Sequence, residues 1–121
     1  LPFAPELVVC DASFIAAAKV VEPVLRLAAP EWEALVLVKP QFEAGPAEAP
    51  KGVVRDPAVH RRVLTEFSAR VGGWGGAVAG IVDSGLPGPK GNREFVVRLH
   101  ASREGTDLDR IRQLVAAAVP D

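Results

Sequence analysis

The chain has 121 residues, which is the length of one domain and too short for a second hydrophobic core. A composition of 49% hydrophobic and 24% charged residues excludes a disordered segment. The 14 Lys and Arg residues against 15 Asp and Glu residues give a net charge of −1, so the chain is not a strongly basic nucleic-acid binder. A single cysteine, Cys10, excludes an internal disulfide framework and a cysteine-based zinc site.

Neither a membrane span nor a signal peptide is visible in the sequence. No apolar run approaches the roughly 18–20 residues of a membrane span, and no charged segment with an apolar stretch opens the chain. We therefore expect a cytoplasmic protein that does not partner a membrane. The sequence contains no Met and begins at Leu1, so we expect a processed protein or a piece of a longer one.

The first third of the chain has the pattern of a strand, a helix and a second strand. Glu6–Asp11 is a short apolar run, Ile15–Ala29 is rich in alanine and interrupted by Pro23, and Ala34–Lys39 is a continuous β-branched run. Continuous apolar strands are typical of parallel sheets that are covered on both faces. These residues therefore predict a βαβ unit.

The rest of the chain predicts two more helices and two more strands. The long segment Pro40–Asp56 shows no period and is expected to be a functional loop. Asp56 and Pro57 have the residue types of a helix start, and Thr106 with Asp109 has the spacing of a capping box. The expected strands and their connection are Ala77–Asp83, the loop Ser84–Arg93, and Glu94–His100. A short loop without a helix favours antiparallel pairing of these two strands, and the predicted order is β-α-β-α-β-β-α.

Three charged residues stand at the ends of otherwise apolar strands. Asp11 closes the first strand, Lys39 closes the second, and Glu94 opens a later one. If the strand that follows Glu94 runs antiparallel to the others, all three charges lie at one edge of the sheet, where α/β proteins bind ligands. Solvated strand ends are the alternative for each residue alone, whereas the three together have the mixed charges of a catalytic site.

Four segments carry a resemblance to a known family. VVCDASFI, LVLVKPQFEAG, KGVVRDPAVHRRVL and GPKGNREFVVRL resemble the C-terminal half of TlyA-type (hemolysin A) RNA methyltransferases, within the FtsJ/RrmJ-like group. The resemblance implies an α/β fold that is the C-terminal half of a Rossmann-like class I methyltransferase sheet, mostly parallel with one antiparallel strand. It also implies one partial domain over residues 1–121, in which 1–103 belong to the methyltransferase domain and 104–121 form a terminal helix.

The resemblance also implies an activity and its residues. The group transfers methyl from S-adenosylmethionine to ribose 2′-hydroxyls and uses a Lys-Asp-Lys-Glu tetrad, of which Asp11, Lys39 and Glu94 match three members. Asp11, Ser13 and Phe14 are then expected to bind the cofactor. The first lysine and the glycine-rich cofactor loop have no counterpart in this sequence. We therefore expect the chain alone to be inactive, with Lys39 held as an ammonium by the two acids.

Ribosomal RNA and ribosomal subunits are the partners that the resemblance implies. The basic residues expected to contact RNA lie in the long loop, the following helix and the later turn: Lys51, Arg55, Arg61, Arg62, Lys90 and Arg93. The alternatives are a solvated loop and helix face, and a turn shaped by Gly91 and Asn92. We expect Cys10 to be a buried strand residue rather than a nucleophile, and both histidines to lie at the surface.

Two other readings of function stay open. One is a non-catalytic module that binds RNA or the ribosome with a methyltransferase-like fold. The other is the membrane lysis suggested by the hemolysin label of the group, which the lack of an apolar span and of a basic amphipathic helix disfavours. The open edge of the Glu6–Asp11 strand additionally predicts a homodimer or strand exchange.

Overall fold

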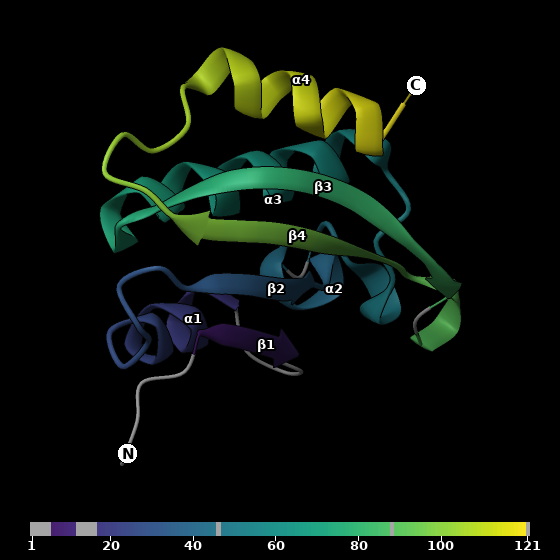
Figure 1. Cartoon of the computed structure of the whole chain (residues 1–121). Coiled ribbons are helices and arrows are strands. Elements are labelled where there is room, and N and C mark those ends of the chain that lie inside the picture. The colour runs from purple at the N-terminus through teal and green to yellow at the C-terminus, as the bar shows by residue number, and fades with distance from the viewer. Residues whose placement is uncertain (1–5, 12–16, 46, 88, 121) are drawn as a thin grey trace.

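The chain forms one sheet with helices packed against it (Figure 1), and the computed structural model describes residues 6–11, 17–45, 47–87 and 89–120. The elements follow in the order β1 (Leu7–Asp11), α1 (Ala17–Leu25), β2 (Glu33–Val38), α2 (Pro40–Glu43), α3 (Pro57–Arg70), β3 (Gly76–Pro87), β4 (Arg93–Ala101) and α4 (Leu108–Ala118). The predicted order is confirmed, and the segment predicted as a loop contains the short helix α2. Helix α1 includes Pro23 and ends at Leu25, four residues before the predicted end.

The sheet has the strand order β1-β2-β4-β3. Strand β1 pairs with β2 in parallel, whereas β4 is antiparallel to both β2 and β3. The prediction of one antiparallel strand is confirmed. The prediction of a mostly parallel sheet is wrong, because β4 lies between β2 and β3 and makes two of the three strand pairings antiparallel. The short β3–β4 connection allows this, since a hairpin needs no crossover helix.

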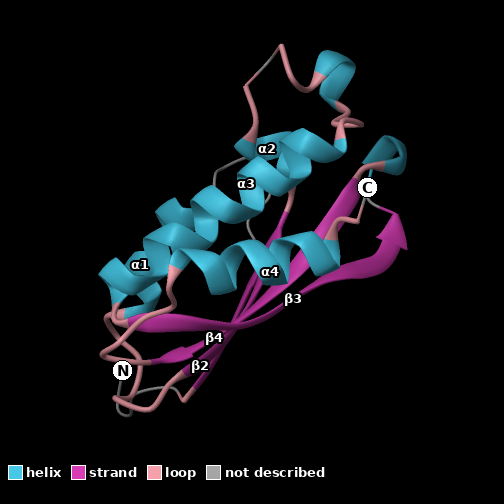
Figure 2. Cartoon of the chain, turned by 90° about the horizontal axis from the view of Figure 1, so that it is seen from above, coloured by secondary structure: helices cyan, strands magenta, loops and turns pink. Residues whose placement is uncertain are grey.

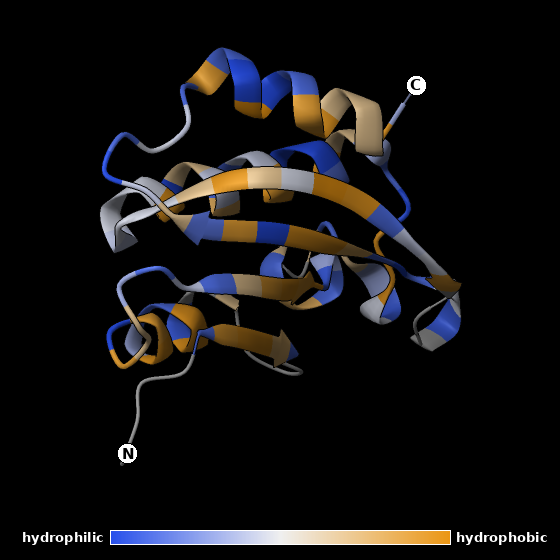
Figure 3. Cartoon of the chain, in the orientation of Figure 1, coloured by the Kyte–Doolittle hydropathy of each residue, from blue (hydrophilic) through white to orange (hydrophobic). Residues whose placement is uncertain are grey.

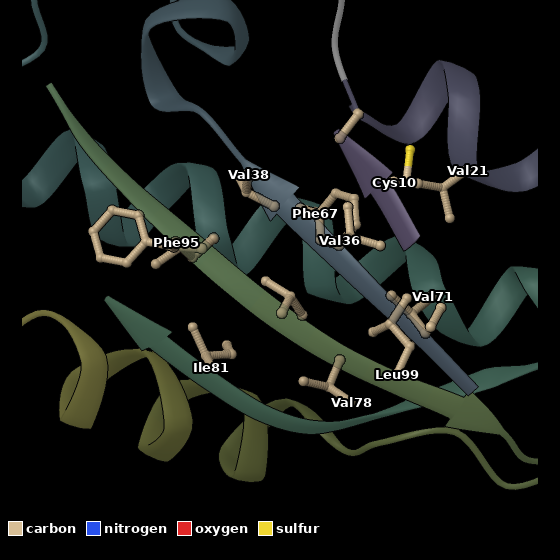
Figure 4. Close-up of a cluster of buried hydrophobic side chains, with 14 of the residues drawn as sticks. Cys10, Val21, Val36, Val38, Phe67, Val71, Val78, Ile81, Phe95 and Leu99 are labelled. Atoms are coloured by element: carbon tan, nitrogen blue, oxygen red, sulfur yellow. The ribbon is translucent and has the colours of Figure 1, made fainter. Parts of the chain in front are cut away.

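The hydrophobic core lies between one face of the sheet and helices α1, α3 and α4, which lie on the same side (Figure 2). The strands contribute every second side chain to this face, as the pleat requires. Figure 4 shows Val36 of β2 beside Phe67 of α3, and both are buried. Val38 of β2 and Phe95 of β4 belong to the same buried cluster, and His60 of α3 packs against the ring of Phe95.

The opposite face of the sheet is not covered by the described residues. Its apolar side chains include Leu7 and Val9 of β1, Leu35 of β2 and Val82 of β3, and Val9 is 71% exposed. Figure 3 shows how apolar β1 is along its length. The expectation that both faces are covered is therefore wrong for the part of the chain that the structure describes. A continuous apolar strand is most stable with cover on both faces, and the described residues provide that cover on one face only.

Two helix starts show that local capping is predictable in one case and not in the other. Asp56 caps α3 as predicted, with its side chain accepting a hydrogen bond from the Ala58 amide at 2.9 Å. Helix α4 is instead capped by Asp107, which accepts from the Arg110 amide at 2.8 Å. The predicted capping box is wrong, because the Thr106 hydroxyl accepts from the Val78 amide of β3 and is unavailable to its own helix.

Gly76 at the start of β3 provides a test of the packing between β3 and Trp32, the residue that precedes β2. A Cβ atom at this position would lie 2.6 Å from the ring of buried Trp32. We therefore expect Gly76→Ala to lower the free energy of unfolding by about 1–3 kcal/mol. Gly80→Ala in the same strand is the matched control, because a Cβ atom there would have no neighbour within 4 Å among the described residues. Urea unfolding of both variants measures the difference, and equal effects would contradict the Trp32 contact.

Candidate active site

The strand register brings Asp11, Lys39 and Glu94 to one end of the sheet. Val38 pairs with Phe95 in the antiparallel β2–β4 ladder, so the next residues outward, Lys39 and Glu94, face each other. Asp11 pairs with Leu37 in the parallel ladder, two residues before Lys39 and therefore on the same face. The convergence expected from an antiparallel β4 is thus present in the structure.

The three side chains form a compact charged cluster. Lys39 Nζ lies 2.8 Å from Asp11 Oδ1 and 4.0 Å from Glu94 Oε2. The side chains of Lys39 and Glu94 are 12% and 13% exposed, whereas that of Asp11 is 56% exposed. The ammonium is therefore shielded from water between two acids, and the Asp11 carboxylate is the member of the cluster that a ligand can reach.

The chain immediately after Lys39 holds this cluster in place. Pro40 restricts Lys39 to extended backbone and begins helix α2, so β2 ends at the residue before Lys39. One residue later, Gln41 Nε2 donates to Glu94 Oε2 at 3.3 Å. Gln41 lies in the VKPQF segment that carried the resemblance, but a glutamine by itself gives no signal of this contact.

Helix α2 also reaches the start of α1 through Glu43. The Glu43 carboxylate accepts a hydrogen bond from the Ala17 amide at 2.6 Å. Burial raises the pKa of Glu43, while this backbone hydrogen bond and the charge of Arg70 oppose the rise. The four residues of α2 therefore connect the end of β2 to both Glu94 and the start of α1. Ser13 and Phe14, the other cofactor-binding candidates, lie outside the described residues.

Cys10 lies beside this cluster but is turned toward the core. It is a free, buried cysteine next to Val21 (Figure 4), as expected from the sequence. Burial raises the pKa of its thiol, and the neighbouring Asp11 carboxylate raises it further. Because the thiolate is the nucleophilic form, Cys10 is poorly suited to nucleophilic chemistry.

The six basic residues expected at an RNA surface have different environments. Lys51, Arg55 and Lys90 are exposed. Arg93 lies 3.9 Å from the Asp83 carboxylate. Arg61 donates to the Val119 carbonyl, which ties α3 to the end of α4. Arg62 is paired with Glu48 and Glu66, and its hydrogen bonds to Glu48 hold the pKa of that carboxyl below its usual range.

Two buried polar residues beneath the long loop were missed or misplaced by the sequence analysis. Asn92, considered as a substrate contact or a turn residue, is 1% exposed and accepts a hydrogen bond from the Val54 amide. His60 is buried, contrary to the expectation of a surface residue, and its Nε2 donates to the Val54 carbonyl at 3.1 Å. His100 is exposed as expected. His60 is buried because α3 turns it toward Phe95, against which its ring packs.

A broad open depression lies at the other end of the sheet. Its volume is about 730 Å³, and its lining includes Trp32, Trp74, His100 and Arg103. It is bounded by the first residue of β2 and the last of β4, so it does not contain the charged cluster. We place the candidate site at the cluster because the reactive side chains converge there.

The described residues contain no group of three or more His, Cys, Asp or Glu side chains arranged to hold a metal ion. In the same residues, no helix is long and apolar enough to cross a bilayer. The cluster offers the chemistry of an amine held between two carboxylates: proton transfer, and attraction of a cationic ligand by the exposed acid.

Comparison with known proteins gives a consistent set of relatives. The model of the family described as FtsJ-like methyltransferase matches residues 2–101. The chain is 41% identical over 105 residues to the "Putative rRNA methyltransferase YqxC" of Bacillus subtilis, and 37% identical over 100 residues to the "16S/23S rRNA (cytidine-2'-O)-methyltransferase TlyA" of Mycobacterium tuberculosis. These alignments cover 85% and 82% of this chain but 37% of each relative, so the chain spans little more than a third of their length.

A solved structure described as "Putative hemolysin from Streptococcus thermophilus" has the same fold. It superposes with a TM-score of 0.85 at 31% identity, over 95% of this chain and 42% of that one. A similar protein from Lactococcus lactis superposes with a TM-score of 0.80 at 29% identity, over 92% of this chain and 56% of that one.

The buried His60 predicts a specific dependence of stability on pH. Burial lowers the pKa of His60, and the charge of Arg93 lowers it further, although the bond to Val54 opposes this. As the pH falls through the unfolded pKa of about 6.5, the unfolded chain gains a proton that the folded chain does not, so the free energy of unfolding decreases.

We expect His60→Gln to reduce this acid-induced loss of stability, as measured by urea unfolding on either side of pH 6.5. His100→Gln is the matched control, because His100 is exposed, and it should retain the loss. An identical pH dependence in the original chain and in His60→Gln would contradict the burial argument.

Proposed function

This chain belongs to the FtsJ-like methyltransferase family, and we propose that it is part of an S-adenosylmethionine-dependent enzyme that methylates ribose 2′-hydroxyls of ribosomal RNA. The observation that carries the proposal is the placement of Lys39 between Asp11 and Glu94 at one end of the sheet. The printed name of the Mycobacterium tuberculosis relative states both the reaction and the RNA. We carry over the class of reaction to this chain but not the target nucleotide. Such an enzyme works on ribosomes, so we also propose a cytoplasmic location.

The described residues fit one part of the proposed cofactor. S-adenosylmethionine supplies a methyl group on a positively charged sulfur, and the exposed carboxylate of Asp11 is the type of group that attracts such a cation. We therefore propose that Asp11 helps to hold the cofactor, with Ser13 and Phe14 beside it. The chain covers little more than a third of its relatives, and we propose that the glycine-rich cofactor loop belongs to the remaining part.

Transfer of methyl to a ribose hydroxyl forms an oxygen–methyl bond and breaks the sulfur–methyl bond of the donor, whose sulfur keeps the electron pair, and the hydroxyl must lose its proton. A lysine accepts that proton only in its neutral form, and the proposed base is Lys39 Nζ. In this chain Lys39 Nζ lies between the carboxylates of Asp11 and Glu94. We propose that the reaction also needs a second lysine, outside this chain, because a neighbouring positive charge favours a neutral amine, and that the chain alone is therefore inactive.

In this scheme the two acids have different tasks. Glu94 is little exposed and is held by Gln41, so it orients the lysine rather than meeting the cofactor. Asp11 is exposed and can contact both the lysine and the ligand. Holding the reacting groups in line accounts for much of the rate of such a reaction.

A non-catalytic module that binds ribosomal RNA is the second candidate. The close Lys39–Asp11 pair favours it, because an ammonium bound to a carboxylate is a stable resting arrangement that requires no turnover. In such a module, Asp11, Lys39 and Glu94 would only stabilise the end of the sheet.

The transfer of labelled methyl groups to ribosomes distinguishes the two candidates. We expect the complete gene product to transfer methyl, and Lys39→Ala to slow the transfer by at least about 100-fold, since a general base contributes 10²–10⁴-fold. Lys19→Ala on the exposed face of α1 is the matched control and should keep full activity. The 121-residue chain alone should transfer none.

A folded gene product that methylates no ribosomal RNA would overturn the enzyme and favour the binding module. Full activity of Lys39→Ala would overturn its role as the base.

We also propose that the isolated chain self-associates through β1. Among the described residues this strand pairs only with β2, so the other side of its backbone can pair with a second copy. The other edge strand, β3, has irregular register at Val78–Gly80 and Asp83–Pro87, which hinders such pairing. The exposed Val9 side chain would be buried in the association.

Light scattering after gel filtration tests this proposal. The isolated chain should elute as a dimer or larger species, and Val9→Lys on β1 should shift it toward the monomer. Val82→Lys, equally placed on β3, should change nothing. A monomeric chain would show that the β1 edge does not drive association.

A further inference from the structure

The tripeptide Pro-Lys-Gly occurs twice and forms a short 3₁₀ turn each time. We call these the Lys51 turn (Pro50–Gly52) and the Lys90 turn (Pro89–Gly91). Both lysines have left-handed backbone, with φ of 57° and 60°. Residues other than glycine adopt this conformation infrequently, and such residues gather at functional sites.

The two turns are held against each other by hydrogen bonds. Lys90 Nζ donates to the Lys51 carbonyl at 2.7 Å, across 39 residues of sequence. Beneath them, the buried Asn92 side chain donates through Nδ2 to the Gly52 carbonyl at 2.8 Å and accepts through Oδ1 from the Val54 amide at 2.9 Å. A single buried amide therefore fixes the position of the long loop relative to the turn that precedes β4.

The clamped turns adjoin the candidate active site. Asn92 comes two residues before Glu94, with only Arg93, the first residue of β4, between them. Lys51 and Lys90 are exposed, and within the described residues neither is paired with a carboxylate. Arg62 and Arg93, by contrast, each lie within 4 Å of an acid. Two positive charges thus lie near the start of β4, the end of the sheet that also holds the reactive cluster, and among the described residues no acid is paired with either.

We propose that the Lys51 and Lys90 turns form a platform that binds phosphates of the RNA substrate, and that Asn92 is the positioning residue that holds the platform beside Glu94. The proposal rests on the proposed function for the identity of its ligand. An ammonium has three donors, and Lys90 uses one of them on the Lys51 carbonyl, which leaves two for phosphate oxygens. Since the chain as a whole has a net charge of −1, a local pair of lysines is needed to attract a polyanion.

The salt dependence of RNA binding tests the two lysines. Fluorescein-labelled single-stranded RNA is titrated with the complete gene product, without S-adenosylmethionine, at several KCl concentrations. Each lysine that contacts a phosphate contributes about 0.7 to the slope of log affinity against log salt, so Lys51→Asn and Lys90→Asn should each lower the slope by about that amount. Asparagine is chosen because it tolerates the left-handed backbone.

Lys19→Gln on α1 removes an exposed charge elsewhere and should leave the slope unchanged. Slopes that stay unchanged in both Lys51→Asn and Lys90→Asn would overturn the platform.

Asn92→Asp tests the positioning role with little change in size. The carboxylate can still accept from the Val54 amide, but it repels the Gly52 carbonyl and breaks the link to the Lys51 turn. We expect the affinity for RNA to fall and Lys51→Asn to have no further effect on the slope in this background. If Lys51→Asn still lowers the salt slope in the Asn92→Asp background, the positioning role of Asn92 is overturned, whatever the stability of the variant.

Methyl transfer measured on the same preparations separates this proposal from the proposed function. Normal transfer with unchanged salt slopes overturns the platform alone. If the complete gene product transfers no methyl but Lys51→Asn and Lys90→Asn still lower the salt slope, the enzyme is overturned and an RNA-binding platform is supported.

Discussion

The insertion of β4 between β2 and β3 is the constraint on which the candidate site depends. Because β4 runs antiparallel to β2, its first residues lie where β2 ends, and Glu94 comes opposite Lys39. A parallel strand in that place would carry its first residues to the other end of the sheet. The same ladder supplies Val36, Val97 and Leu99 to the core, so one register serves both packing and chemistry. A slip of one residue would move Glu94 to the helix-covered face.

Side-chain hydrogen bonds hold the segments around the site in the positions that the sheet sets. Helix α2 has only four residues, yet Gln41 reaches Glu94 and Glu43 reaches the start of α1. Asn92 performs a similar task for the long loop. Each contact joins a segment that has few buried apolar residues of its own to the end of a strand or helix that packs in the core. The segments around the site are therefore ordered by polar contacts, whereas the sheet is ordered by apolar packing.

Much of this arrangement was predictable from local sequence patterns. The apolar runs located the strands, Asp56 and Pro57 located the start of α3, and the short β3–β4 connection indicated an antiparallel strand. These features depend on residues that are neighbours in the chain. The convergence of Asp11, Lys39 and Glu94 followed from that topology.

The failures share a physical reason, which is that they depend on partners far apart in sequence. Thr106 has the residue type of a helix cap but is used by Val78 of β3, and His60 is polar but is buried by the ring of Phe95. Gln41 and Asn92 have ordinary polar side chains whose importance arises only from Glu94 and Gly52. The sheet was expected to be mostly parallel because strand direction could be inferred, whereas the neighbour of each strand could not.

The left-handed backbone at Lys51 and Lys90 has a consequence for how related sequences should vary. Glycine and asparagine occupy that backbone at a lower conformational cost than lysine does, so stability alone would favour replacing both lysines. Lysine is then kept at these positions only where its charge is used. In relatives that have changed their RNA target, Gly or Asn at these two sites would mark the loss of contact before any change reached the strands.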